Sequence, residues 1–92
     1  MKYKIYENII THFEENKEYL MNSVTGKVIE LNNIASYVLQ NLMNNKSMNE
    51  ILNDICNTYI QINREDIEKD INLFLEKLEK DNYIFKTNEL IG

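Results

Sequence analysis

The sequence predicts an α+β domain in which a three-stranded antiparallel β-meander is followed by three α-helices. Two observations predict this order. Before Asn32, short stretches rich in β-branched and aromatic residues alternate with polar breaks, as in strands joined by turns. From Asn32 onward, apolar residues recur at the spacing of one helix face. A meander has an apolar face that needs covering, and the helices that follow supply that cover.

Three strands are expected, at Ile9–Phe13, Tyr19–Met21 and Val28–Leu31. The break before the third strand contains Gly26, and glycine readily supplies the positive φ angle that a hairpin turn requires. A polar segment at Glu14–Lys17 forms the other turn. Because both turns are short, the strands pair in chain order, and the third strand is expected to leave an unpaired edge.

Two helices follow this sheet. Asn32 or Asn33 caps the first helix by accepting a backbone N–H, and polar residues at 44–46 end it. Ser47 and Glu50 match the S-x-x-E capping box, which begins a second helix. The inner faces of the two helices are expected to consist of Ile34, Ala35, Val38, Leu39, Leu42, Ile51, Leu52, Ile55, Cys56 and Tyr59.

A third helix is expected after a short extended piece at Ile60–Ile62. Asn63 caps this helix, which runs to about Asp81. At about 100° per residue, Leu73 lies outside its apolar arc. Leu73 is therefore a surface leucine, a contact for the C-terminal tail, or part of an exposed groove. The inner face of the third helix is expected to consist of Ile67, Ile71, Phe74, Leu75 and Leu78.

The chain is expected to form a single domain, residues 1–92, because this length supplies one compact core and not two. The core spans about residues 9–85. Tyr83–Phe85 either adds a brief terminal strand or folds back on the core, and residues 86–92 are expected to be frayed.

The composition offers little for catalysis or metal binding. The sequence has one histidine, His12, and one cysteine, Cys56, and neither has a neighbour suited to activating it. One His and one Cys cannot supply a zinc set, and two glycines cannot build a phosphate-binding loop. We expect His12 on the surface or an edge strand, Cys56 in the core, and no enzyme activity, cofactor or metal.

Charge and hydropathy narrow the choice of partners. Ten Lys and Arg against fifteen Asp and Glu give a net charge of −5, the wrong sign for attraction to a phosphate backbone. The N-terminus lacks the apolar segment of a signal peptide, and no window approaches the roughly 18 apolar residues of a membrane span. The sequence therefore predicts a soluble cytoplasmic protein without nucleic acid or membrane partners.

The predicted edge strand lies next to helices with ample apolar surface. Main-chain pairing with this strand would set the register of an extended peptide, and alternate peptide side chains would point toward the third helix. A peptide receptor and an inert accessory domain are the two interpretations that this pattern allows.

Four segments of the sequence, taken in order, form one further pattern. Asn22–Asn32 combines a polar turn containing Thr-Gly with a basic residue, two apolar residues and a Glu-Leu-Asn helix opening. Ser47–Ile51 opens a helix as Ser-x-x-Glu-Ile, Tyr59–Asn63 leaves it, and Asp70–Leu78 belongs to a third helix that is followed by a polar turn and an apolar pair. In order and spacing over about residues 9–85, these segments resemble PqqD-like proteins, the recognition elements for ribosomally synthesised and post-translationally modified peptides (RiPPs).

The resemblance implies a winged-helix-like fold, that is, a winged helix-turn-helix of three strands and three helices, without catalysis. It implies that the chain binds the leader peptide of a RiPP precursor as an added strand between the third strand and the third helix. Carried over by position, the peptide-binding residues are Val28, Ile29, Glu30, Asp70, Leu73, Phe74 and Lys77.

The resemblance also implies an accessory role in biosynthesis, because the 92 residues contain no fused enzyme segment. As a peptide chaperone, the chain presents the leader to a separate modifying enzyme: a radical SAM enzyme, a lasso-type protease or a cyclodehydratase. Such tethering raises the local concentration of a flexible precursor to about millimolar. An open strand edge also permits self-pairing, so a monomer and a strand-paired homodimer are both expected forms.

Two alternatives come from other functional classes. A winged-helix DNA-binding or protein-interaction regulator has the same three-helix plan, but acidic residues outnumber basic ones on the third helix, which opposes DNA binding. A carrier protein would use Ser47 as its attachment point. Lys46 stands where such carriers have Asp, and a strand-rich N-terminus is foreign to them.

Overall fold

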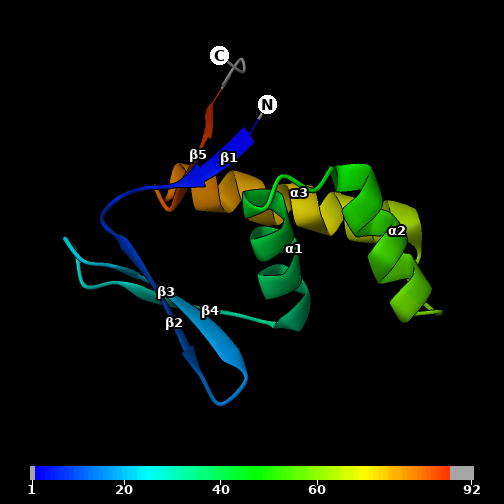
Figure 1. Cartoon of the computed structure of the whole chain (residues 1–92), viewed down its shortest axis with the longest axis horizontal. Helices are drawn as coiled ribbons and strands as arrows, with labels where there is room; N and C mark the ends of the chain where they lie inside the picture. The colour runs from blue at the N-terminus through cyan, green and yellow to red at the C-terminus, as the bar shows by residue number, and fades with distance from the viewer. Residues whose placement is uncertain (1, 88–92) are drawn as a thin grey trace.

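The structure is a computed structural model that describes residues 2–87. Within these residues, three helices and five strands follow the order β1 (Lys2–Ile5), β2 (Ile9–Glu14), β3 (Lys17–Asn22), β4 (Val28–Leu31), α1 (Asn33–Met43), α2 (Met48–Thr58), α3 (Arg64–Lys80) and β5 (Ile84–Thr87) (Figure 1). The predicted α+β class, with a meander followed by three helices, is confirmed.

The meander pairs β2, β3 and β4 in chain order, and both of its strand pairs are antiparallel. Glu15 and Asn16 join β2 to β3 with φ angles of 50° and 67°, as in a two-residue hairpin turn. Gly26 lies in the second turn with a φ of 78°, as its position predicts. Strand alternation turns Leu20 and Leu31 to the same buried face.

A second sheet was not expected from the sequence. β1 pairs antiparallel with β5 at the two ends of the described chain. Tyr83–Phe85 therefore leads into a strand, one of the two predicted outcomes. The prediction of fraying was wrong for Lys86 and Thr87, because both pair with β1. Residues 88–92 lie outside the described residues.

Side-chain caps set the helix starts as the sequence predicts. Asn32 Oδ1 accepts the Ala35 N–H at 2.8 Å and begins α1. Ser47 and Glu50 form the reciprocal capping box of α2. Asn63 caps α3 by accepting two backbone N–H groups. These local hydrogen bonds explain why three helix starts are readable without tertiary information.

Asparagine also ends two of the helices. Asn45 after α1 and Asn82 after α3 adopt positive φ angles of 67° and 61°. The next residue along donates its N–H back into the helix at 2.9 Å in both cases, which is the Schellman arrangement. Asparagine tolerates this left-handed conformation better than most residues. Part of the asparagine content therefore replaces glycine at helix ends.

The connection between α2 and α3 differs from the prediction. Ile60–Ile62 forms a turn instead of an extended piece, and the Ile62 N–H donates to the Tyr59 carbonyl at 3.2 Å. Tyr59 is 42% exposed, so it does not belong to the buried face of α2. Cys56 is half-buried and not a full core residue. Both lie in the last turn of α2 or just beyond it, where less of the protein covers the helix.

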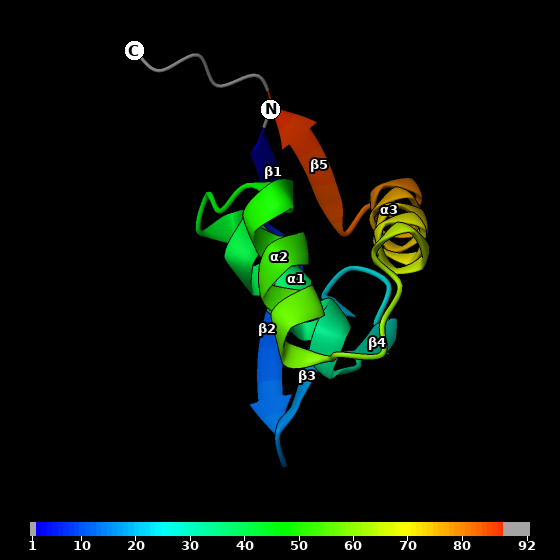
Figure 2. The same cartoon turned by 90° about the vertical axis from the view of Figure 1, so that its right-hand side faces the viewer.

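α1 lies at the centre of the fold and contacts β1, β3, β4, α2 and α3. Figure 1 shows the meander on one side of this helix and α3 running across its upper end, and Figure 2 shows α3 nearly end-on. The core between these elements consists of Ile9, Leu20, Leu31, Val38, Leu39, Ile51, Leu52, Ile55, Ile71, Leu75, Leu78, Tyr83 and Ile84.

One carboxylate lies within this apolar interior. Glu18 on β3 is 4% exposed, and the Ser36 hydroxyl of α1 donates to its Oε1 at 2.5 Å. Gln40 in turn donates to the Ser36 hydroxyl at 2.9 Å. A buried polar side chain is tolerated when it is hydrogen-bonded, and this chain of bonds also holds the meander to α1. No helix within residues 2–87 is long and apolar enough to cross a membrane.

A polar cluster joins α1 to α2 at the surface. Lys46 Nζ and the Tyr37 hydroxyl both donate to Asp54 Oδ2, each at 2.7 Å. These hydrogen bonds, from Lys46 first and then from Tyr37, hold the pKa of Asp54 below its usual value. The same contact with Asp54 raises the pKa of Lys46 and of Tyr37.

The variant Asp54→Asn is expected to lose stability at pH 7 and to differ less from the natural protein at low pH. The pKa of Asp54 is lower in the folded protein than its value of about 3.9 in the unfolded chain, so its charge stabilises the fold above that value. This stabilisation disappears as the pH falls through the folded pKa. Urea denaturation of both proteins at about pH 7 and pH 2.5 measures the difference. If the two proteins differ in free energy of unfolding by the same amount at both pH values, the lowered pKa of Asp54 is contradicted.

Candidate functional site

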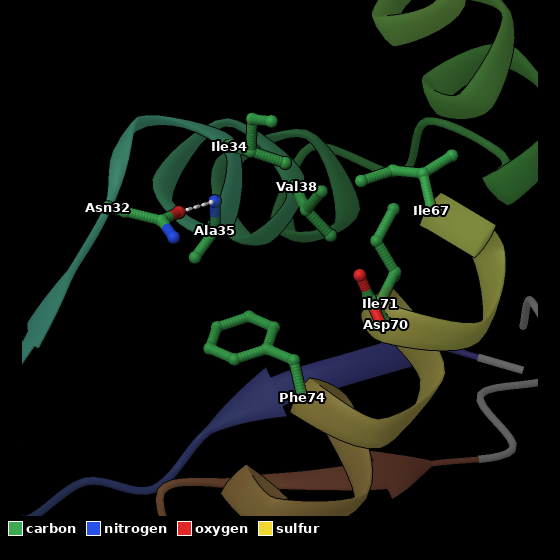
Figure 3. A pocket seen from close by; sticks show the side chains of 8 residues that line it. All are labelled: Asn32, Ile34, Ala35, Val38, Ile67, Asp70, Ile71 and Phe74. Carbon is green, nitrogen blue, oxygen red and sulfur yellow. Dashed lines mark hydrogen bonds between the residues drawn. The ribbon is translucent and has the colours of Figure 1, made fainter. Parts of the chain in front are cut away.

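An apolar hollow of about 250 Å³ lies between the first half of α1 and α3, beside the end of β4 (Figure 3). We call it the groove. It opens to solvent between the two helices, and six of its eight lining side chains are apolar. The lining residues are Asn32, Ile34, Ala35, Val38, Ile67, Asp70, Ile71 and Phe74.

The groove follows from where the chain enters α1. Asn32 comes directly after β4 and caps α1, so the first turn of the helix lies beside the end of the strand. Helical spacing turns Ile67, Ile71 and Phe74 of α3 toward the same space. Ile71 is buried, whereas Ile67 and Phe74 are only half-buried. Apolar surface therefore remains open to a ligand.

Asp70 is the single charged residue among the eight that line the groove. Figure 3 shows it on α3 between Ile67 and Phe74. It is exposed, and its carboxylate has no hydrogen bond or ion pair within residues 2–87. The groove thus combines an apolar wall with one unpaired negative charge at its rim.

β4 leaves backbone groups unpaired next to the groove, since within residues 2–87 it pairs with β3 alone. The Asn22 N–H donates to the Lys27 carbonyl at 2.8 Å. In an antiparallel ladder, pairs with and without mutual hydrogen bonds alternate. The next pair, Met21 with Val28, therefore has no mutual hydrogen bonds, and neither does the pair that contains Glu30, two residues farther along β4. The N–H and C=O groups of Val28 and Glu30 consequently point away from β3, toward the open edge.

The strand residues predicted for the site differ in where their side chains lie. Ile29 is half-buried and packs against the core. Val28 is 55% exposed on the opposite face of the sheet, where it lines a separate hollow with Ile10 and Met21. Glu30 lies on that same outer face and pairs with Lys17 at 3.4 Å. Val28 and Glu30 therefore offer the groove side their backbone and not their side chains.

The structure divides the predicted helix residues into two pairs. Asp70 and Phe74 line the groove. Leu73 and Lys77 line another shallow hollow farther around α3, together with Glu76, Lys80 and Asp81. Leu73, 55% exposed, is thus a surface leucine beside the groove and not part of its wall.

Six lining residues were not predicted as site residues: Asn32, Ile34, Ala35, Val38, Ile67 and Ile71. The sequence assigned the first to a cap and the others to helix inner faces. Helical periodicity identifies an apolar face but not which part of it stays uncovered, because that depends on the neighbouring elements. The one usable signal is Asn32, which links the edge strand directly to a helix.

The described residues supply no metal centre. Within 2–87, no three or more His, Cys, Asp or Glu side chains lie together as potential ligands. His12 lies exposed on the edge strand β2, as expected, with its ring 3.7 Å from a Glu14 carboxylate oxygen. The groove is therefore the feature of these residues that best fits a ligand, and its chemistry suits an apolar, extended one.

Comparison with known proteins identifies related sequences and folds. The family model of coenzyme PQQ synthesis protein D (PqqD) matches residues 19–84, from β3 to the start of β5. No curated protein matches the chain significantly.

Two solved structures have a similar fold. A lasso peptide synthetase B1 complexed with its leader peptide has a TM-score of 0.82 and 17% identity, over 94% of this chain and 100% of that one. TbiB1 in complex with the TbiA(beta) leader peptide has a TM-score of 0.77 and 24% identity, over 97% of this chain and 100% of that one. At these identities the likeness establishes the fold.

Replacing Phe74 by Ala is expected to lower the free energy of unfolding by about 1–2 kcal/mol, because Phe74 is half-buried; fully buried phenylalanines lose about 3–5 kcal/mol. Leu73→Ala, the exposed neighbour, is the matched control and should change stability by less than about 0.5 kcal/mol. Chemical denaturation measures both variants. A loss of about 4 kcal/mol for Phe74→Ala would make Phe74 a core residue instead of a groove wall.

Proposed function

The chain belongs to the PqqD family, and we propose that it binds the leader peptide of a RiPP precursor by adding the peptide as a strand to β4. The observation that carries the proposal is the open edge of β4 beside the apolar groove. The two similar structures support it, since both of those proteins hold leader peptides.

Strand addition uses the unpaired backbone groups of Val28 and Glu30. Two N–H and two C=O groups give about four hydrogen bonds, each worth about 0.5–1.5 kcal/mol net. They fix the register of the peptide but read little of its sequence.

The groove provides the sequence-dependent part of binding. Successive side chains of a strand alternate between faces, so every second leader side chain points into the groove against Phe74 and Ile71. Burying an apolar side chain contributes about 1.5–3 kcal/mol. One or two such anchors, added to the backbone pairing, suffice for an affinity near micromolar, about −8 kcal/mol. Leu73 and Lys77 lie outside this proposed contact.

The proposed role is recognition without catalysis by a single domain in the cytoplasm. By holding the leader, the chain keeps the rest of the precursor at an effective concentration of about millimolar near a separate modifying enzyme. A radical SAM enzyme, a lasso-type protease and a cyclodehydratase all fit this role. With its β4 edge free the chain can be a monomer, and pairing of two such edges would give a homodimer that competes with the leader.

Substituting proline for Val28 is expected to weaken leader binding about two- to tenfold, because it removes one N–H from the open edge while leaving the bonds to β3 in place. The probe is a synthetic peptide covering the leader segment of a candidate RiPP precursor, chosen from those encoded near the gene for this chain. Fluorescence anisotropy gives the dissociation constant, and circular dichroism checks that the variant folds.

Thr11→Pro is the matched control on the opposite edge of the same sheet. Ser23 donates its N–H to the Asn8 carbonyl at 2.8 Å, so by alternation the Thr11 N–H also points away from β3. This variant should bind the leader as the natural protein does. If both proline variants bind equally well or equally poorly, the peptide does not add to β4.

A further inference from the structure

We propose that Asp70 makes the groove select leaders carrying a lysine or arginine two residues from the apolar side chain that enters the groove. This inference rests on the proposed function and specifies its substrate class. It assigns to one side chain a role in specificity that the fold and the family match leave open.

The first support is the isolation of the charge. Asp70 is the one charged residue lining the groove, and within residues 2–87 its carboxylate has no partner. Its neighbours in the groove wall, Ile67, Ile71 and Phe74, cannot hydrogen-bond to it. The carboxylate is exposed, so water solvates it while the groove is empty.

A bound peptide changes this environment. An added strand covers the groove and removes part of the water from Asp70, which costs free energy unless a charge-assisted hydrogen bond replaces it. A leader cation supplies that bond. A leader acid at the same place adds like-charge repulsion, reinforced by the net charge of −5 and by Asp66 one turn earlier on α3. Selection therefore arises from attraction to one class of leader and from a penalty against the other.

The spacing follows from helix and strand geometry. Asp70 and Phe74 are four residues apart on α3, which is about 6 Å along the helix axis. Residues i and i+2 of a strand point to the same face and lie about 6.6–6.8 Å apart. β4 and α3 both run mainly across the view of Figure 1, so a strand added to β4 runs along α3. A peptide with an apolar side chain against Phe74 thus places the side chain two residues away beside Asp70.

The experiment uses the same synthetic leader as above. An alanine scan first identifies the apolar residue whose replacement weakens binding most. Single Lys and single Glu substitutions are then placed two residues before and two residues after it, and dissociation constants are measured by fluorescence anisotropy at low salt. The proteins are the natural chain, Asp70→Asn, and the control Glu68→Gln, which removes one charge from α3 outside the groove.

Lysine is expected to bind about fivefold more tightly than glutamate at one of the two positions with the natural chain and with Glu68→Gln. Asp70→Asn should remove this preference, and Asp70→Lys should reverse it so that the glutamate peptide binds more tightly. Because Asp70 is exposed, these variants should keep the fold, and circular dichroism checks this.

Four results overturn the proposal. A lysine preference that survives in Asp70→Asn, or that is lost equally in Glu68→Gln, would show a diffuse effect of the net charge. Equal binding of lysine and glutamate peptides would show that Asp70 does not read the leader, while strand addition stands. If no leader peptide binds at all, the proposed function fails, and this inference fails with it.

Discussion

The fold depends on covering the inner face of the three-stranded meander. Leu20 in its central strand is fully buried, and so is Val38 on α1. A small sheet alone is unstable in water, so its apolar face needs a helix against it. Since Asn32 turns the chain from β4 straight into α1, the helix that covers the sheet is also the one nearest to the edge strand. The buried Glu18, hydrogen-bonded to Ser36, joins the same two layers.

This arrangement covers one face of the sheet and leaves the edge of β4 open. Open edges are a liability, because they pair with other strands. β4 is only four residues long, and Glu30 on its outer face forms an ion pair with Lys17 of β3; the short length and the charges both discourage uncontrolled association. A short edge with a neighbouring apolar groove admits one extended segment more readily than a flat sheet of another molecule. The open edge of β4 is thus a liability for association and, at the same time, the feature suited to recognition.

In the proposed mode of binding, the candidate site separates affinity from specificity. The backbone groups of Val28 and Glu30 would pair with a peptide of any sequence, whereas the groove wall and Asp70 would respond to particular side chains. Such a division allows one fold to serve different leaders by changing a few residues on α1 and α3 while the strand edge stays the same. In the proposed mode of binding, the peptide would complete the sheet and close the groove at once, so a domain of this size needs no deep cavity.

The sequence by itself determined the elements whose signals are local. Asn32, Ser47 and Asn63 mark helix starts because each accepts a hydrogen bond from a backbone N–H two or three residues ahead. Gly26 marks a hairpin because a positive φ angle is a property of one residue. The strand edge and two groove residues, Asp70 and Phe74, were predicted from this local order together with a family resemblance.

Only the tertiary structure decided which apolar surface stays uncovered and how the chain ends meet. β1 becomes a strand because β5, at the other end of the described chain, pairs with it, and no short window contains both partners. Ile67 and Leu73 both lie on α3, yet one lines the groove and the other does not. Val28 presents its side chain to the outer face and its backbone to the edge. Exposure of this kind depends on contacts between residues distant in sequence, which periodicity does not encode.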